Sequence, residues 1–204
     1  GVETFNTGYT TVTYYVTDRA GNEASCSFLV FVKDKEAPII TGVPANATVD
    51  CDAIPDPAEV TVSDNCTPEA DIDLQFSEVV NDPTGACPYN YTIVRTWIAT
   101  DTCGNADTLV QTLTVQDTTP PTFTDVPMIM VDNDPGECGA DVTIEYTDNN
   151  AFDNCAPGVT FTFSASFGGD PVNFDNGETL FFPVDTTTVF VTATDSCGNS
   201  STES

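Results

Sequence analysis

Ile98-Ala-Thr-Asp-Thr-Cys-Gly-Asn105 is the stretch that decides the fold, because the chain carries two further versions of it. The earlier version is Tyr15-Val-Thr-Asp-Arg-Ala-Gly-Asn22 and the later one is Thr192-Ala-Thr-Asp-Ser-Cys-Gly-Asn199. The aspartates of the three versions lie 83 and 94 residues apart. Each version stands between two runs rich in β-branched and aromatic residues, which is typical of a turn joining adjacent strands. A period of this length is typical of a β-sandwich domain.

Two more motifs keep the same order around this turn. Asp-Asn-Cys occurs at 64–66 and 153–155, and an aspartate followed shortly by proline occurs at 34–38 and 117–121. No stretch shows a convincing helical period. We therefore predict an all-β protein made of tandem immunoglobulin-like antiparallel β-sandwich repeats.

The repeat spacing also predicts the domain boundaries. We expect residues 1–33 to be the C-terminal hairpin of a partial repeat, residues 34–116 a complete repeat, and residues 117–204 a repeat lacking its last strand. A lone hairpin cannot bury its apolar face. The chain is thus expected to be a window on a longer polymer, or to pair its end pieces with another chain.

The charge balance excludes two classes of partner. Only 4 residues are Lys or Arg and 32 are Asp or Glu, giving a net charge of -28. Such a surface repels nucleic acid and anionic membranes and attracts cations. No apolar run reaches the ~18 residues of a membrane span, so no membrane insertion is expected.

Eight cysteines raise the choice between disulfides and a zinc site. The chain has no histidine and no Cys-x-x-Cys pair, so the usual zinc spacings are missing. Disulfides are the better interpretation, and they indicate a secreted protein, extracellular or on the cell surface. We expect its signal peptide to lie outside this segment or to have been removed.

The motifs together resemble a known family. Asp117-Thr-Thr-Pro-Pro121, Asp-Asn-Cys, Ala-Thr-Asp-x-Cys-Gly-Asn and Ala24-Ser-Cys-Ser-Phe-x-Val30 resemble the hyalin-type (HYR) repeat. Related immunoglobulin-like repeats occur in giant secreted adhesins of gliding and filamentous bacteria. The resemblance implies an adhesin stalk, and it says little about a ligand because such repeats are generic building blocks.

An immunoglobulin-like repeat with strands A to G predicts the disulfide pairs. Successive strands alternate in direction, so the B–C loop with Asp-Asn-Cys and the F–G loop with Asp-x-Cys-Gly-Asn lie at one end, beside the entering linker. The remaining two cysteines of the complete repeat precede strands at the opposite end. The predicted pairs are Cys66–Cys103, Cys155–Cys197 and Cys51–Cys87, with the partners of Cys26 and Cys138 outside this chain.

The same end of each repeat gathers oxygen ligands, which predicts bound Ca²⁺ that stiffens each junction. Related adhesin repeats are similar in using calcium at such linkers. The alternative is that these Asp and Asn residues only cap turns. Residues 132–137 look calcium-like in isolation but map to the opposite end, where we interpret them as a turn. The candidate ligands are Asp34, Asp64, Asn65, Asp101 and Asn105 in one repeat, and Asp117, Asp153, Asn154, Asp195 and Asn199 in the next.

The expected function is that of a structural stalk module and not of an enzyme. The chain offers no histidine base, no nucleophile elbow and no phosphate loop. We expect it to contact neighbouring repeats, with a homo-oligomer or filament possible and a surface target reached through other domains.

Two alternative functions stay open, a glycan- or protein-binding module and an accessory domain of a secreted hydrolase. Exposed aromatic residues would favour the first, but we expect the candidates to pack in the core, as we also expect for Trp97, while Arg95 snorkels at the end of its strand. The aromatic candidates are Phe167, Phe174, Phe181 and Phe182.

Overall fold

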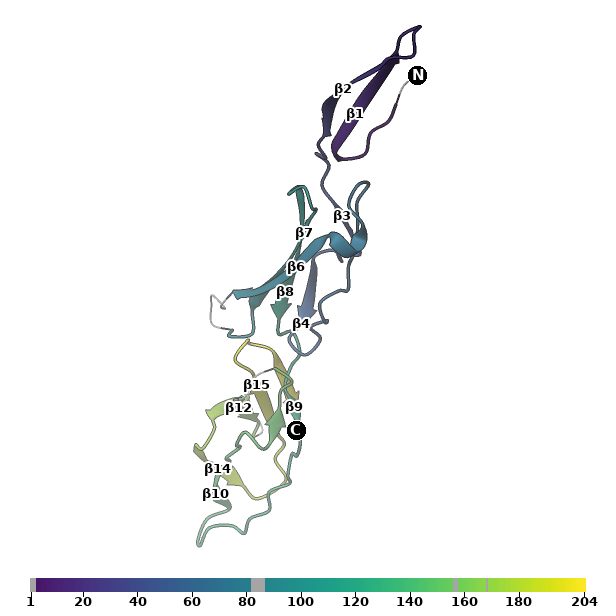
Figure 1. Ribbon diagram of the computed structural model, residues 1–204. Coiled ribbons are helices and arrows are strands. Elements are labelled where there is room, and N and C mark those ends of the chain that lie inside the picture. Colours follow the sequence, from purple (N-terminus) through teal and green to yellow (C-terminus); the bar gives the residue numbers. More distant parts are fainter. Residues whose placement is uncertain (1–2, 82–86, 156–157, 168) are drawn as a thin grey trace. The chain divides into compact units, whose positions relative to one another are not determined.

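Extended strands make up nearly all of the regular structure. The computed structural model describes residues 3–81, 87–155, 158–167 and 169–204. These residues form sixteen strands (Figure 1). The one helical element among them is a 3₁₀ turn, η1 (Glu69–Asp71). The predicted all-β class of immunoglobulin-like antiparallel repeats is confirmed.

The chain divides into two compact units, each built from segments that are discontinuous in sequence. Unit 1 comprises residues 1–45, 57–79 and 94–111, and unit 2 comprises residues 46–56, 80–93 and 112–204. This division follows compactness and cuts through the stretch predicted as one complete repeat. The repeat boundaries at 1–33, 34–116 and 117–204 stay a prediction.

The N-terminal part of unit 1 is a long antiparallel hairpin. Strands β1 (Gly8–Thr17) and β2 (Glu23–Val32) pair along their whole length, from Gly8 opposite Val32 to Thr17 opposite Glu23. The first Asp-x-x-Gly-Asn motif joins them, as its sequence predicts. Most side chains of both strands are exposed, so the hairpin has little core of its own.

The second part of unit 1 holds a small core against strand β7 (Tyr91–Thr100). Trp97 is 2% exposed and lies with Ala99 in a cluster that includes Ile40 of β3 (Ile39–Thr41) and Val62 of β5 (Thr61–Ser63), so its predicted core position is confirmed. Strands β3 and β5 pair antiparallel. A four-stranded sheet, whose residues belong partly to unit 1 and partly to unit 2, orders β4 (Ala47–Asp50), β8 (Ala106–Gln116), β7 and β6 (Asp73–Asn81).

Arg95 lies in the buried row of β7 and does not reach solvent at the end of the strand. It is 3% exposed, and its Nε donates to Glu78 Oε2 of strand β6 at 2.8 Å. The predicted snorkelling is therefore wrong. A buried guanidinium needs a compensating charge, and the neighbouring strand supplies one.

Unit 2 contains a parallel strand pair. β4 runs parallel to the end of β8, with Ala47 opposite Leu113 and Asp50 opposite Gln116. Leu113 and Val115 are 0% exposed and pack with Ile93 and partly buried Val49. β4 ends at Asp50, so Cys51 directly follows this paired strand.

The rest of unit 2 surrounds the largest core cluster among the described residues. It comprises Phe161, Phe163, Phe174, Val191 and other buried apolar residues. A four-stranded sheet provides many of them, and two short antiparallel pairs provide others. The sheet orders β13 (Val172–Asp175), β12 (Thr160–Ala165), β15 (Val189–Thr194) and β16 (Ser200–Glu203); the pairs are β10 (Gly139–Thr143) with β14 (Thr179–Pro183), and β9 (Thr122–Phe123) with β11 (Ala151–Phe152).

Three of the four phenylalanines predicted to be core residues contribute to this core. Phe174 is buried, and Phe167 and Phe182 are partly buried against it. Phe181 is 46% exposed, so the prediction is wrong for this residue. Side chains alternate along β14, and the strand turns Leu180 and Phe182 inward.

Candidate cation sites and disulfide cross-links

Each Asp-x-x-Gly-Asn motif folds into the same self-capped turn. Asp101 Oδ1 accepts the N–H groups of Cys103 at 2.9 Å and Asn105 at 2.7 Å, and Asp101 Oδ2 accepts from Asn105 Nδ2 at 2.7 Å. Gly104 has φ +86°, which a side chain disfavours. Asp195 repeats the arrangement with Cys197 and Asn199. The turn-capping role, offered as the alternative to metal binding, is therefore real for both aspartates.

Acidic cluster 1 consists of Asp34, Asp64 and Asp101, all in unit 1. One carboxylate oxygen from each lies within 4.8 Å of the others. Oxygens bound to a single Ca²⁺ at about 2.3–2.6 Å are at most about 5 Å apart, so the spacing fits. Asp34 is 5% exposed, and its Oδ2 is buried without a hydrogen-bond partner. Burial of a carboxylate oxygen without a hydrogen-bond partner is costly, and a bound cation would offset that cost.

Acidic cluster 2 consists of Asp117, Asp153 and Asp195, all in unit 2. Asp117 offers an oxygen within 4.8 Å of Asp195 in one group and of Asp153 in another. Asn199 connects two of them, because its Nδ2 donates to Asp195 Oδ2 at 2.9 Å and to Asp117 Oδ1 at 3.4 Å. Asp117 Oδ2 and Asn154 Oδ1 are buried without a hydrogen-bond partner. Asp117 in the cluster and Asn154, the residue after Asp153, thus each contribute a buried oxygen that could ligate a cation.

Charge crowding affects the ionisation of these groups. Burial, together with the charges of Asp153, Asp195 and Asp50, raises the pKa of Asp117 despite a hydrogen bond from Thr119. Burial opposes ionisation of Asp101 as well, but the hydrogen bonds from Asn105 and its neighbours outweigh it and lower the pKa of Asp101. A bound cation would favour the charged form of Asp117.

The structure brings the six predicted aspartates together in the two clusters. Asn65 Nδ2 donates to Glu36 Oε2 at 2.6 Å, a contact that the sequence reasoning missed. The side-chain amide of Asn105 donates to Asp101 and adds no further contact to the cluster. In the 132–137 segment, Asp134 Oδ2 accepts the N–H of Asp141 at 2.9 Å, as expected for a turn held by its own hydrogen bonds.

The disulfide bonds differ from the predicted pairs. Cys51 bonds to Cys155 with Cα atoms 5.9 Å apart, and Cys87 bonds to Cys197 with Cα atoms 4.4 Å apart. The predicted pairs Cys51–Cys87 and Cys155–Cys197 are therefore wrong. The bonds span 104 and 110 residues and link the predicted complete repeat to the next one.

The predicted pair Cys66–Cys103 is also wrong, because both cysteines are free and exposed. Partial desolvation and then the charge of Asp34, with weaker contributions from Asp64 and Glu36, raise the pKa of the Cys66 thiol. Cys26 and Cys138 are free and exposed as well, and bonds to partners outside this chain stay a prediction.

Hydrogen bonds to Asp50 hold Cys51 beside the segment that leads into the following repeat. Its Oδ1 accepts the N–H of Cys51 at 2.8 Å, and its Oδ2 accepts from the hydroxyls of Thr118 at 2.9 Å and Thr119 at 3.3 Å. These bonds lower the pKa of Asp50, although burial acts against them. The sequence analysis did not select Asp50, and its position directly before Cys51 is the signal that could have found it.

Residues 2–32 match the HYR domain family. The matched segment contains the first turn motif and both strands of the N-terminal hairpin. It covers only part of the chain, and it supports an HYR-type immunoglobulin-like repeat.

Solved structures give weak similarity. One is a protocadherin gammaB7 cis-dimer of extracellular repeats EC3-6, 15% identical with a TM-score of 0.34 over 96% of this chain and 56% of that chain. Another is the protocadherin GammaB4 extracellular domain, 15% identical with a TM-score of 0.35 over 95% and 37%. A third contains CBM51-2 and INT domains of Clostridium perfringens ZmpB, 14% identical with a TM-score of 0.25 over 76% and 43%. The chain spans about half or less of these proteins. Their TM-scores are too low for these structures to indicate a function.

The described residues contain no helix that is long and apolar enough to span a membrane.

Proposed function

We propose that this chain is a load-bearing module of an extracellular, adhesion-type repeat protein, in which disulfides and calcium stiffen the transition from one repeat to the next. The HYR match, the recurring turn motif and the two disulfides support this proposal. Disulfides persist in oxidising compartments, which favours the cell surface or the medium as its location.

The observation that carries the proposal is the coincidence of two disulfides with acidic cluster 2. Cys155 and Cys197 each stand two residues after an aspartate of the cluster, Asp153 and Asp195. Covalent bonds here close loops of more than a hundred residues, which removes much conformational freedom from the unfolded chain. A site fixed in this way is suited to resist force.

Calcium is the cation that these residues favour. Their donors are carboxylate and amide oxygens, and Ca²⁺ accepts six to eight such ligands in flexible geometry. The aspartates of each cluster provide part of that number, and backbone carbonyls or water would provide the rest. The cation would offset the buried charge of Asp34 and Asp117 and part of the net charge of -28.

Catalysis is not part of the proposed function. The chain has no histidine, and the two cysteines nearest acidic cluster 2 are joined to other cysteines. Asp101 and Asp195 are engaged in capping their turns. A glycan-binding role has less support, because of the four phenylalanines considered only Phe181 is well exposed.

Thermal unfolding of the whole chain in calcium and in a chelator tests the proposal. Saturation at about 100 times the dissociation constant should add about 2.7 kcal/mol, which corresponds to a rise in Tm of roughly 5–10 °C. Small-angle scattering should show a more extended and less flexible particle with calcium. Asp117→Asn should remove part of the rise, whereas Asp132→Asn, outside both clusters, should leave it intact. An equal Tm and an equal scattering profile in both solutions would contradict the calcium proposal.

A further inference from the structure

Two four-stranded sheets of the chain differ at one edge. β7 and β15 correspond to each other, because each leads into an Asp-x-Cys-Gly-Asn turn, at Asp101 and at Asp195. β6 lies beside β7 and forms the edge of its sheet, whereas β12 lies beside β15 and pairs on its other side with β13. The chain from β12 to β15 runs through β13 and β14 over residues 166–188, but residues 82–90 alone connect β6 to β7. Among the described residues, no strand pairs with the outer edge of β6.

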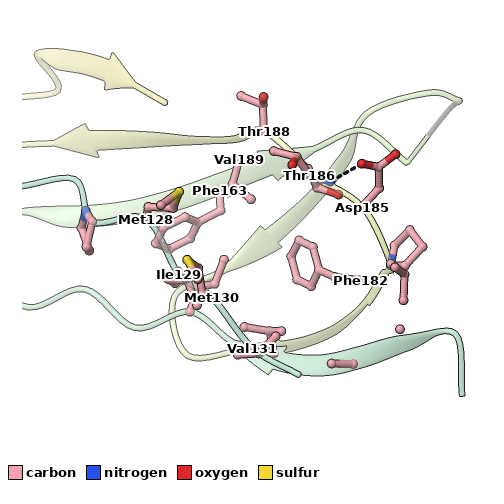
Figure 2. A pocket seen from close by; sticks show the side chains of 18 of the residues that line it. Met128, Ile129, Met130, Val131, Phe163, Phe182, Asp185, Thr186, Thr188 and Val189 are labelled. Atoms are coloured by element: carbon pink, nitrogen blue, oxygen red, sulfur yellow. Dashed lines mark hydrogen bonds between the residues drawn. The ribbon is translucent and has the colours of Figure 1, made fainter. Parts of the chain in front are cut away.

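Phe76 of β6 has the position that Phe163 has in β12. Phe163 stands opposite Val191, and Phe76 contacts Trp97 with ring centroids 5.3 Å apart. Val191 and Trp97 each stand four residues before the aspartate of their turn. Phe163 is 3% exposed and lies among the apolar side chains of unit 2 (Figure 2), whereas Phe76 is 46% exposed. The same position is therefore buried in one sheet and open in the other.

The strand β13 covers Phe163 in the second sheet. Phe174 of β13 stands opposite Phe163, and the two rings stack with centroids 5.3 Å apart. Val172 lies two residues earlier in β13 and therefore on the same face as Phe174. An antiparallel strand with an apolar residue two positions before a phenylalanine thus completes this edge. β6 itself contains this pattern, in Leu74-Gln-Phe76.

An antiparallel pair of β6 strands from two copies of the chain reproduces this arrangement when it is centred on Phe76. Phe76 of one copy then stands opposite Phe76 of the other, which repeats the pair of phenylalanines in β12 and β13. Leu74 of each copy stands opposite Glu78 of the other, and Gln75 stands opposite Ser77. The sequence of β6 therefore matches its own edge.

The charges of β6 are compatible with this contact. The strand has two carboxylates, Asp73 and Glu78. Glu78 Oε2 accepts from Arg95 Nε at 2.8 Å, so a cation balances its charge. Asp73 stands opposite Val79 of the second copy, so no two carboxylates face each other. Like charges directly opposite in a strand pair are destabilising, and their absence favours this register.

The size of the edge indicates how strong the contact is. β6 has 9 residues, which at about 3.3 Å per residue gives a strand roughly 30 Å long. A contact between two such edges belongs to the weak class of interfaces, which bury less than about 1,200 Å² in total. The net charge of -28 on each copy opposes their approach, and salt screens this repulsion. We therefore expect a reversible dimer that salt strengthens.

We propose that the outer edge of β6 is an interaction surface for β6 of a second copy of this chain, bound by antiparallel strand addition with Phe76 opposite Phe76. Main-chain hydrogen bonds between the two edges join the two sheets. Each Phe76 ring keeps its contact with Trp97 and gains the ring of the other copy. The same surface is used on both copies, so the contact is isologous and closes as a dimer.

Sedimentation velocity of the whole chain tests this inference. The protein is kept in chelator, so that the result does not depend on calcium and is distinguishable from a failure of the proposed function. Its free thiols are alkylated, so that disulfides between chains cannot form. Dimer should increase with protein concentration, and more strongly in about 0.5 M salt than in about 0.05 M salt. A chain that stays monomeric at several hundred micromolar in high salt would overturn the proposal.

Charged pairs on the outer face of β6 test the register. Gln75→Lys with Ser77→Lys sets like charges opposite each other twice in the dimer and should weaken association about tenfold. Gln75→Lys with Ser77→Glu sets opposite charges there and should strengthen association several-fold. Thr11→Lys with Thr13→Lys adds the same charge at exposed positions of β1 and is the matched control, which should not weaken association. Equal effects of the two double-lysine variants would refute the contact at β6.

Contacts between copies can also be observed directly. In an equal mixture of ¹³C-labelled and unlabelled chains, filtered nuclear Overhauser spectra should show the Phe76 ring of a labelled chain beside the Phe76 ring of an unlabelled one. Phe76→Ala should remove this signal and shift the protein toward monomer, with thermal melting to show that the variant stays folded. Contacts between chains at other strands, with none at Phe76, would contradict the proposed surface.

Discussion

Acidic clusters 1 and 2 share their motifs but differ in the cysteines beside them. In both, an Asp-x-Cys-Gly-Asn turn caps itself with the same hydrogen bonds, at Asp101 and at Asp195. Cys66 and Cys103 beside cluster 1 are free thiols, whereas Cys155 and Cys197 beside cluster 2 are bonded to distant cysteines. The motif therefore determines the turn, and the segments packed against it determine the covalent state. Four predictions test this comparison.

Removing one cross-link beside cluster 2 should have the largest effect. Cys51→Ser with Cys155→Ser creates no new unpaired thiol and should lower the free energy of unfolding by about 3–5 kcal/mol, since a loop closed over 104 residues is released. Chemical denaturation under oxidising conditions measures it. Cys66→Ser with Cys103→Ser, the matched pair beside cluster 1, should change stability by less than about 0.5 kcal/mol. A comparable loss in the second variant would mean that these cysteines are bonded too.

A buried charge distinguishes the two repeats at one strand position, where Arg95 corresponds to Val189. Arg95→Val should destabilise the protein by about 1–2 kcal/mol, because the charge-assisted hydrogen bond to Glu78 on β6 is lost while water still reaches the Glu78 side chain, which is 35% exposed. The double change Arg95→Val with Glu78→Val should recover a substantial part of the loss. Urea unfolding of the three proteins measures the coupling. Additive effects of the two changes would indicate that the ion pair contributes nothing.

The shared turn predicts equal effects in both repeats. Gly104→Ala and Gly198→Ala should each cost about 1 kcal/mol, because φ is +86° and +92° at these residues. Gly169 has open space around it and no such φ, so Gly169→Ala is the control and should cost less than about 0.5 kcal/mol. Thermal melting compares them. A large difference between the first two variants would show that the turns are not energetically equivalent.

The smallest effect concerns pH in the absence of calcium. The pKa of Asp117 is raised on folding, so the folded chain keeps this proton where the unfolded chain, with a pKa of about 3.9, has lost it. The stability from this group is present at low pH and declines as the pH rises above about 4. Asp101 and Asp50, with lowered pKa values, act in the opposite sense and below that pH.

Asp117→Asn should therefore remove the decline in stability as the pH rises above about 4, relative to the unchanged protein. Melting temperatures measured across this range in chelator show the difference. Saturating calcium should remove the same decline without a substitution. An unchanged pH profile in the variant would exclude Asp117 as its source.

The sequence predicted the parts of the site that depend on neighbouring residues. An Asp-x-x-Gly-Asn segment brings its own acceptor, donor and left-handed glycine within five residues, so its turn follows from local chemistry alone. The alternation of apolar residues likewise placed Trp97 in the core. Applied to β14, the same alternation would have predicted that Phe181 faces outward.

The disulfide pairs could not be predicted in this way. Cys51 and Cys155 are separated by 104 residues, and several pairings satisfy the loop order of a sandwich equally well. The tertiary structure decided among them through the parallel pairing of β4 with β8 and the bonds from Thr118 and Thr119 to Asp50.

The sequence by itself determined the all-β class, the repeated turns and the acidic character of this protein, because each depends on composition or on residues a few positions apart. Only the tertiary structure decided which cysteines bond, where Asp34 and Asp117 are buried, and that Arg95 finds Glu78. These outcomes depend on which strands and loops lie side by side. That arrangement reflects the free energy of the whole fold, and no single motif encodes it.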